Sequence, residues 1–437
     1  MQHAPARELL HFIKNSPTCY HVTENIRQKL LANGYTELSE RERWEVAPGG
    51  KYFVCRNGSS TIAFRVPEMI GGGFAMAAAH SDSPAFRLKE HPDRRSAHYV
   101  QLSTEKYGGM LMSTWFDRPL SVAGRVFVRA NGEIVEKLVS VDRDLLVIPS
   151  LAIHFQRDVN KGKVFNPQID MQPLWGPAGS RTLTDLVCEE LGITAEEILD
   201  WDLQLVTRQA PVQIGPDNEY FMAPRIDDLE CAATTLLAFL DASGEADSAC
   251  APVWAMFDNE EVGSSSRMGA ESSFLRDVLD RILDAVPHSG QAAARAMANS
   301  FMLSADNAHA THPNFPQKAD PCAPVRMGGG VVLKYNASQK YTTNAVSGAV
   351  FRAVCEKAGV PVQVFTNRAD EPGGSTLGNL QSHTLPIPMA DIGCAQLAMH
   401  SAVETASVAD AEAMIKAVAA FYRVHLRALG DGTYTLE

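Results

Sequence analysis

The sequence predicts an α/β protein in which a mixed, largely parallel sheet is flanked by helices and a mostly β domain is inserted into the chain. Three observations support this prediction. Strand-like apolar runs alternate with helical segments near both ends of the chain. Several of these runs lead directly into polar residues, as strands do where an α/β sheet holds its ligand. Between residues 88 and 212 the apolar runs are short and broken by turn signals, which is typical of a β-rich domain.

The first part of the chain is predicted to form two helices followed by strands. Residues 5–15 and 22–33 have the apolar spacing of short amphipathic helices. Residues 61–66 and 73–79 are strand-like, and the second run leads directly into His80. We therefore expect His80 to lie at the ligand-binding edge of a sheet.

The middle of the chain, residues 88–212, is interpreted as an inserted β domain. Residues 122–129 and 133–140 flank an Asn-Gly turn, which predicts a β-hairpin. A further strand is expected near 144–148. The polar, glycine-bearing stretch 153–162 is expected to be a loop.

Strands and helices alternate again in the last part of the chain. The spacing of leucines predicts a helix over 229–240. Buried strands are predicted at 252–257, 300–306, 331–334 and 361–365. The chain is expected to close with an amphipathic helix over 407–429, with Ser407 and Asp410 as a capping pair at its start. The larger domain is therefore discontinuous, built from both ends of the chain around the insertion.

Composition and charge exclude several classes of partner. The chain has 437 residues, 45% of them hydrophobic, and a formal net charge of −12. A basic surface for nucleic acid or for an anionic membrane is therefore not expected. No apolar run approaches the roughly 20 residues that a membrane span needs, and the opening segment lacks a signal-peptide core. The eight cysteines are scattered, as reduced thiols are, so we expect a cytoplasmic protein.

Polar residues with metal-binding chemistry follow several of the predicted strands. Two imidazoles and several carboxylates suit a pair of zinc ions, with cobalt or manganese as substitutes. Two ions about 3.5–4 Å apart need one carboxylate that bridges them and further ligands for each ion. With Asp227 as the bridge, His80 and Asp306 serve one ion. Glu261 and His400 serve the other.

Two further acidic residues have roles beside the metals. Glu260 is left over from the ligand count, so it is the candidate to take a proton from water at the metals. Neighbouring side chains diverge in an extended loop, which lets Glu261 ligate while Glu260 faces the substrate. Asp82 follows His80 by two residues, a spacing that lets its carboxylate accept the other ring N–H of that histidine.

Six stretches of the sequence together carry a family resemblance. They are AAAHSDSP (77–84), APRIDDLE (223–230), FDNEEVGSSS (257–266), LSADNAHATHPN (303–314), VLKYNASQKYTTNAVS (332–347) and AQLAMHSAVET (395–405). In this order and at these intervals they resemble the aspartyl aminopeptidase family over nearly the whole chain. The resemblance implies a zinc exopeptidase-like catalytic domain over residues 1–87 plus 213–437. It also implies an oligomerisation domain over 88–212, and closed homo-oligomers that are commonly tetrahedral dodecamers.

The resemblance also implies roles for individual residues. The five ligands named above are implied to bind metal, with Glu260 as general base. Lys334 is implied to hold the acidic side chain of the substrate's first residue, with Tyr341 in the same pocket. His154 resembles a histidine that reaches a neighbouring subunit's active site and stabilises the oxyanion. His309, in a proline-bearing loop, is assigned to the substrate side, with a structural role as the alternative.

One position departs from the family pattern. Asp228 stands where asparagine is expected in many relatives, which leaves two aspartates as candidates for the bridge. Asp227 is favoured because it directly follows Arg225-Ile226, as in the family motif.

These assignments predict a metal-dependent aminopeptidase. It would hydrolyse the first peptide bond of a peptide with a free N-terminus, preferring Asp or Glu as the first residue, with a water held between two metals and Glu260 as base. One alternative is a neutral-residue aminopeptidase or an N-acyl amidohydrolase on the same metal centre. Another is a non-catalytic oligomeric scaffold or cargo-binding shell, against which the presence of every required residue argues.

Overall fold

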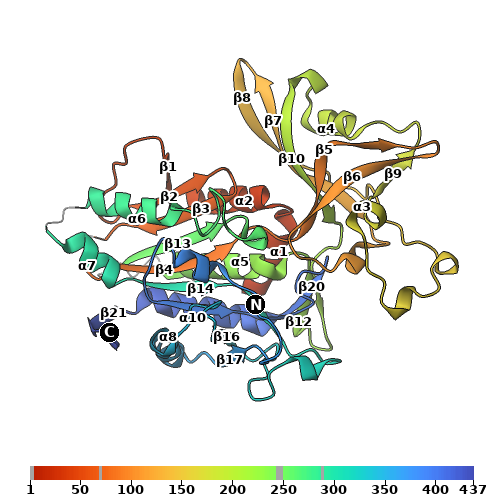
Figure 1. Ribbon diagram of the computed structural model, residues 1–437. Helices are drawn as coiled ribbons and strands as arrows, with labels where there is room; N and C mark the ends of the chain where they lie inside the picture. Colours follow the sequence, from red (N-terminus) through yellow and green to blue (C-terminus); the bar gives the residue numbers. More distant parts are fainter. Residues whose placement is uncertain (1–3, 68–70, 243–249, 287–289) are drawn as a thin grey trace.

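Two large sheets, each with its own helices, make up most of the computed structural model (Figure 1), which describes residues 4–67, 71–242, 250–286 and 290–437. The predicted α/β class with a mixed sheet is confirmed. Within the described ranges, no helix combines the length and the apolar character that crossing a bilayer requires.

The larger sheet has nine strands in the order β1-β2-β3-β13-β4-β14-β18-β16-β17. They are β1 (Thr36–Leu38), β2 (Lys51–Arg56), β3 (Ser60–Arg65), β13 (Ala251–Phe257), β4 (Phe74–His80), β14 (Phe301–Ala305), β18 (Met389–Gly393), β16 (Val331–Tyr335) and β17 (Val362–Thr366). The central strands β13, β4, β14 and β18 are parallel, whereas β3 and β16 run antiparallel to their central neighbours. The carboxyl ends of the four central strands therefore share one edge of the sheet.

The central strands are uninterrupted apolar runs because both of their faces are buried. Alternate residues of β4 enter different cores: Ala77 faces one, and Met76 faces the other. The first core is formed with α1 (Ala4–Asn15), α2 (Cys19–Ala32), α5 (Ile226–Asp241), α8 (Ala345–Ala358) and α10 (Val408–Arg423). The second is formed with α6 (Phe274–Ala285), α7 (Ala292–Ala298) and α9 (Leu377–Gln381).

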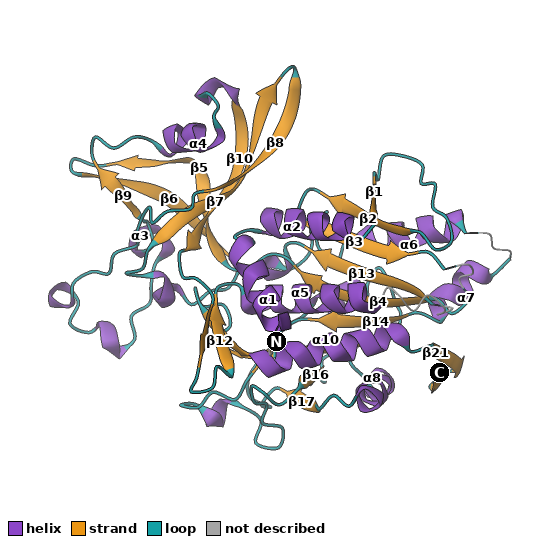
Figure 2. Ribbon diagram, turned by 180° about the vertical axis from the view of Figure 1, so that it is seen from behind, coloured by secondary structure: helices purple, strands orange, loops and turns teal. Residues whose placement is uncertain are grey.

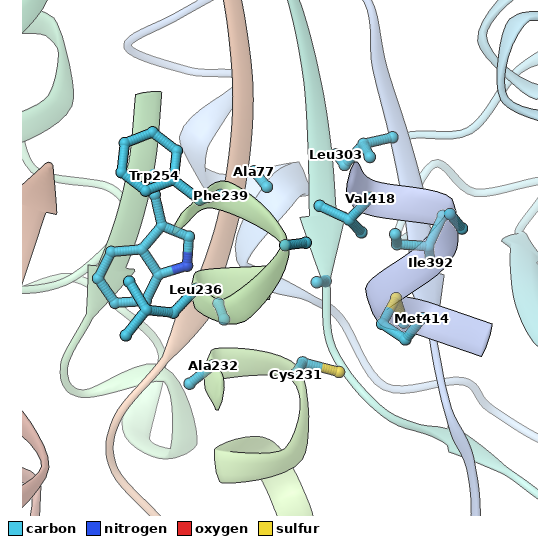
Figure 3. Packing of buried hydrophobic residues seen from close by; sticks show 14 of the residues in the cluster. Ala77, Cys231, Ala232, Leu236, Phe239, Trp254, Leu303, Ile392, Met414 and Val418 are labelled. Carbon is cyan, nitrogen blue, oxygen red and sulfur yellow. The ribbon is translucent and has the colours of Figure 1, made fainter. Parts of the chain in front are cut away.

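The first core is packed closely between the sheet and its helices. Figure 2 shows α1, α5 and α10 covering one face of the sheet. In Figure 3, Trp254 of β13 lies beside Phe239 and Leu236 of α5, while Met414 and Val418 of α10 lie on the other side of that helix. Full burial of such side chains contributes about 1.5–3 kcal/mol each. The sheet edge that carries the candidate ligands therefore rests on a rigid support.

The second sheet has six strands in the order β8-β7-β10-β5-β6-β9 and a core of its own. They are β8 (Glu133–Ser140), β7 (Leu120–Ala130), β10 (Ile198–Thr207), β5 (Ala85–Arg95), β6 (Tyr99–Tyr107) and β9 (Leu174–Pro177), accompanied by α3 (Pro167–Asp170) and α4 (Leu183–Leu191). The predicted hairpin is confirmed as β7 and β8. The predicted strand at 144–148 is wrong. Leu145 and Leu146 both donate to the carbonyl of Leu120, and this irregularity leaves isolated bridges in place of a ladder.

The end of the chain differs from the prediction in two respects. The closing helix stops at Arg423, and β21 (Leu426–Gly430) pairs with β22 (Thr433–Leu436) around an Asp-Gly turn, whose chemistry favours a hairpin over a longer helix. Ser407 and Asp410 do not form a capping pair. The carboxylate of Asp410 instead accepts hydrogen bonds from the backbone N–H groups of Gly328 and Gly330, both at 2.7 Å.

A smaller sheet lies beside the carboxyl edge of the nine-stranded sheet. Its strands follow the order β11 (Val212–Ile214), β12 (Tyr220–Ala223), β20 (Glu404–Ser407), β19 (Ala395–Leu397) and β15 (Ala308–His309). This sheet places the β19–β20 connection, residues 398–403, next to the segment that follows β14.

Candidate metal centre

The residues predicted to bind metal converge at the carboxyl edge of the central sheet. His80 is the last residue of β4, and Asp306 directly follows β14. Asp227 lies at the start of α5, and Glu261 lies in a short turn after β13. His400 comes from the connection between β19 and β20. Because parallel strands end at one edge, segments distant in the sequence meet there.

The turn after β13 presents two adjacent glutamates. Glu260–Val262 forms a single 3-10 turn between Asn259 and Gly263, whose φ angles of 62° and 99° are left-handed. Glycine and asparagine adopt this conformation most readily. The carboxylate of Asp82 accepts hydrogen bonds from the backbone N–H groups of Glu260 and Glu261, both at 3.1 Å. Asp82, in the segment that follows β4, therefore holds the turn in place.

Asp227 lies between the two histidines. Its Oδ1 is 3.4 Å from Nε2 of His80, and its Oδ2 is 3.2 Å from Nε2 of His400. The same nitrogen of His400 lies 3.3 Å from Oε1 of Glu261. A carboxylate whose two oxygens face different ligands has the arrangement that a bridge between two cations requires.

Candidate ligand atoms within 4.8 Å of one another fall into three overlapping groups among the described residues. They are His80 with Asp227, Asp228 and Asp306; His80 with Glu260 and Glu261; and Asp227 with Glu261 and His400. Asp227 belongs to both the first group and the third. These two groups contain every residue that the sequence assigned as a ligand.

The donor atoms of this cluster fit divalent cations. Oδ1 of Asp227 and Oε1 of Glu261 are buried and accept no hydrogen bond from any described residue. Burial and the charge of Asp227 raise the pKa of Glu261 well above its usual range. Burial also raises the pKa of Asp306, although Lys334 acts to lower it. Cations would relieve both the desolvation and the repulsion, and imidazole with carboxylate is a ligand set that zinc accepts.

The two adjacent aspartates have different surroundings. Oδ2 of Asp228 accepts a hydrogen bond from the backbone N–H of His80 at 3.2 Å, and burial raises the pKa of Asp228 well above its usual range. Burial acts in the same direction on Asp227, but contacts with His400 and His80 outweigh it and lower the pKa of that carboxyl. This contrast favours Asp227 as the ionised bridge.

His80 is held by more than one part of Asp82. Its Nδ1 lies 3.1 Å from the backbone oxygen of Asp82 and 3.4 Å from Oδ1. The backbone carbonyl, not the predicted carboxylate, is therefore the nearer acceptor for the ring. The carboxylate of Asp82 accepts from the glutamate turn, so one aspartate contacts both the histidine and the turn. Burial alone would lower the pKa of His80, but Asp228, Asp227 and Asp82 together raise it well above its usual range.

Glu260 has the acid–base properties expected of a proton carrier. Burial, with the charges of Asp306, Asp82 and Asp227, raises the pKa of Glu260 to about 8. A carboxyl group with such a pKa exchanges its proton near neutral pH, which is what general acid–base catalysis needs.

A cavity of about 330 Å³ opens over the cluster. Besides the candidate ligands, it is lined by Glu260, Asn307, Ala308, His309, Lys334, Tyr341, Phe365, Gly374, Ser375, Thr376 and Met399. Nζ of Lys334 donates a hydrogen bond to the backbone oxygen of Asp306 at 2.6 Å and lies 5.3 Å from the ring centre of Tyr341. The predicted substrate-side residues therefore lie in one cavity with the candidate ligands.

His154 lies away from this cavity. It is an exposed residue of the short turn Ile153–Phe155, in the part of the chain that belongs to the second sheet. The surrounding loop exposes Leu151, Ile153, Phe155, Val164 and Ile169. His154 is not among the residues that line the cavity of its own chain.

Two residues that contact the site were not predicted from the sequence. Glu404 is buried, and its carboxylate accepts hydrogen bonds from the backbone N–H groups of Asp227 at 3.0 Å and His400 at 2.6 Å. Tyr107, the last residue of β6, donates to Oδ2 of Asp82 at 2.6 Å. Glu404 follows His400 by four residues within a quoted motif, a signal that could have identified it. Tyr107 lies in the predicted insertion, and nothing in its local sequence connects it with the site.

The sequence matches a known family along almost its full length. Residues 12–422 match the family described as aminopeptidase I zinc metalloprotease (M18). A probable M18 family aminopeptidase 2 of Clostridium acetobutylicum is 42% identical over 429 residues, covering 96% of this chain and 98% of the relative. A protein of the same description from Pseudomonas aeruginosa is 39% identical over 423 residues, covering 95% and 97%.

The fold is similar to solved structures. One chain of the Ape4 and Nbr1 complex superposes with a TM-score of 0.93 at 34% identity, covering 96% of this chain and 85% of that one. The S. cerevisiae mApe1 dodecamer gives a TM-score of 0.86 at 26% identity, covering 96% and 97%.

Proposed function

The chain belongs to the M18 family of zinc metallo-aminopeptidases, and from this premise we propose that it removes an acidic first residue from peptides by a two-zinc mechanism. The observation that carries the proposal is the position of Asp227, whose two oxygens each face one histidine. An arrangement of this kind suits two ions better than one.

His80, Asp227 and Asp306 would hold one ion, and Asp227, Glu261 and His400 the other. The groups of ligand atoms within 4.8 Å support this division. Zinc, when bound, polarises a peptide carbonyl and eases the deprotonation of water. Cobalt and manganese accept the same ligand types and are the expected substitutes.

Glu260 acts as the general base in this proposal. Its carboxylate takes a proton from the attacking water and later gives it to the leaving amine. Three observations support the role: its half-buried position at the cavity, its raised pKa, and the hydrogen bond from its backbone N–H to Asp82. The fixed turn holds the carboxylate of Glu260 beside the cavity, where it need not bind a metal ion.

Lys334 is proposed to select the acidic side chain of the first residue. It is the only lysine or arginine among the described residues that line the cavity, and it is buried. A desolvated ammonium attracts a substrate carboxylate strongly. A neutral first residue offers no such charge pair, so an acidic first residue is preferred. Tyr341 and His309 border the same space and would complete the subsite.

A neutral-residue aminopeptidase is the second candidate, and the engagement of Lys334 favours it. The ammonium already donates to the backbone oxygen of Asp306 at 2.6 Å and lies 3.7 Å from its Oδ1. If the contact with Asp306 already satisfies the ammonium, an acidic first residue gains little binding energy from Lys334. An N-acyl amidohydrolase on the same centre would not need a free amino group.

His154 is proposed to act in a neighbouring copy of the chain. Its exposed loop and the apolar side chains around it suit an interface between copies. The similarity to a dodecameric relative supports a large homo-oligomer, assembled through the part of the chain between residues 88 and 212. We also propose a cytoplasmic location.

A substrate panel on metal-stripped and reloaded protein tests the function. Cleavage of Asp-, Glu-, Leu- and Lys-anilides and deacetylation of an N-acetyl amino acid would be compared with zinc, cobalt and manganese. We expect zinc to restore activity, with Asp and Glu preferred and the N-acetyl compound uncleaved. A preference for Leu would favour the second candidate, and a protein that binds no zinc would support a non-catalytic scaffold.

A further inference from the structure

The segment that leaves β6 contacts the loops that carry two of the candidate ligands, His400 and Glu261. We call residues 107–114 the β6 exit segment. The backbone N–H of Leu111 donates to the carbonyl of His400 at 3.0 Å, and Oγ1 of Thr114 accepts from the backbone N–H of Ala402 at 2.9 Å. A side chain at Gly108 would come within 3.2 Å of Cβ of Glu261. A segment of the six-stranded sheet thus contacts the loops that carry two candidate ligands.

Tyr107, at the start of this segment, is tied to the glutamate turn by hydrogen bonds. Its hydroxyl donates to Oδ2 of Asp82 at 2.6 Å and accepts from Nδ2 of Asn259 at 3.0 Å. The same carboxylate of Asp82 accepts from the backbone N–H groups of Glu260 and Glu261. A continuous path of hydrogen bonds therefore joins the six-stranded sheet to the proposed base.

Asn259, which precedes the glutamate turn, has a second side-chain partner. Oδ1 of Asn259 accepts a hydrogen bond from Oγ of Ser266 at 2.7 Å, so both ends of the Asn259 amide are engaged. The ring of Tyr107 is buried, with the guanidinium carbon of Arg87 4.0 Å from its centre. The hydroxyl of Tyr107 is thus held by a strand of the six-stranded sheet in contact with the carboxylate of Asp82.

We propose that Tyr107 is a positioning residue for Glu260 and Glu261, acting through Asp82. The inference rests on the proposed function, because it concerns the orientation of the proposed base. With the hydroxyl in place, Asp82 has three donors and a single favoured orientation. Without it, the carboxylate keeps only the backbone donors of the turn and the contact with His80, so Oδ2 is held less firmly as an acceptor for the turn.

The test replaces Tyr107 by phenylalanine, which removes only the hydroxyl. Tyr99→Phe is the matched control because Tyr99 begins the same strand with its side chain exposed. We expect Tyr107→Phe to lower kcat about 10- to 100-fold with a nearly unchanged KM, as loss of an outer partner of a metal site does. We expect Tyr99→Phe to match the parent protein.

A second readout needs no activity. In metal-free protein, deuterium exchange at the backbone amides of residues 258–264 should be faster in Tyr107→Phe than in the parent and in Tyr99→Phe. A role confined to packing of the six-stranded sheet would instead speed exchange in β6 and its neighbours. Asn259→Gly, which removes the other hydrogen bond to the hydroxyl and suits the left-handed backbone, should also speed exchange in the turn.

A double substitution tests the path through Asp82. Because the effect is transmitted by that carboxylate, Tyr107→Phe should change kcat little when added to Asp82→Asn, whereas independent effects would multiply. If the parent protein is active and Tyr107→Phe has the parent's kcat and the parent's exchange rates, the positioning role is overturned and the proposed function stays intact. A parent that cleaves no anilide with any metal would overturn both.

Discussion

The ammonium nitrogen of Lys334 lies 2.6 Å from the backbone carbonyl oxygen of Asp306. The same nitrogen is 3.7 Å from the carboxylate of this candidate ligand. The residue proposed to recognise the substrate is therefore in direct contact with the metal centre. We therefore expect the charge of Lys334 to affect both the selection of the substrate's first residue and the position of Asp306.

Lys334→Met should reduce selectivity for acidic substrates. Methionine keeps the apolar stem but removes the cation, so an Asp or Glu side chain would be desolvated without a partner. We expect the ratio of kcat/KM for Asp-anilide to that for Leu-anilide to fall at least tenfold, which corresponds to about 1.4 kcal/mol. Lys357→Met, at an exposed position of α8, is the control. An unchanged ratio would remove Lys334 from the recognition of acidic residues.

Glu260→Gln and Glu261→Gln should have opposite signatures although the residues are adjacent. Glu260→Gln should retain both ions and lose about 10²- to 10⁴-fold in kcat, because it removes the proton acceptor. Glu261→Gln should lose metal, because it removes a ligand. Metal analysis of the purified variants, together with kcat at saturating substrate, separates the two. Near-normal turnover in Glu260→Gln would exclude it as the base.

Glu404→Gln should weaken metal binding without removing a ligand. The Glu404 carboxylate accepts from the backbone N–H groups of Asp227 and His400, so it fixes the spacing between the proposed bridge and the second histidine. An amide presents only one oxygen to these two donors. We expect zinc affinity, measured by competition with a chelator, to fall about 10- to 100-fold. Glu356→Gln, exposed on α8, should bind zinc normally.

His21 should make the fold sensitive to acid independently of the metal centre. Burial, and to a smaller extent the charge of Arg225, lower the pKa of His21 to about 4. An unfolded histidine, with a pKa of about 6.5, takes up a proton on acidification before the folded one does. Stability is therefore lost as the pH falls from about 6.5 towards 4, by about 2 kcal/mol at pH 5.

Urea unfolding of metal-free protein at pH 7 and pH 5 measures this effect. The loss of stability between the two pH values should be smaller in His21→Gln by about the stated amount. Equal losses in parent and variant would show that His21 does not contribute.

The sequence was most informative where strands are buried on both faces. The apolar runs that end at His80 and precede Glu260 were recognised because burial leaves little choice of residue, and their polar ends marked the site. The helix predicted over 407–429 was too long, because apolar spacing is similar in a helix and a short hairpin. The Asp-Gly turn after β21 carried the deciding information.

The contacts of Tyr107 could not be predicted for a different reason. Its partner Asp82 is 25 residues away, in the connection between β4 and β5, and no local pattern states which strand end will face which loop. Asp410 is a similar case, since its spacing from Ser407 suggested a cap while its carboxylate is occupied by distant glycine amides. Local rules describe what a side chain is able to do. Tertiary packing decides which partner it meets.

The wide spread of the ligands along the chain has a consequence for biosynthesis. His80, Glu261 and His400 are far apart in the sequence, so a nascent polypeptide contains His80 well before it contains the other two. Until the segment with His400 has left the ribosome, the second ion would lack one of its proposed ligands. On these assignments an unfinished chain has no complete metal centre. We expect products truncated before residue 400 to be inert towards neighbouring peptides, because they lack His400 and also α10, which forms part of the first core.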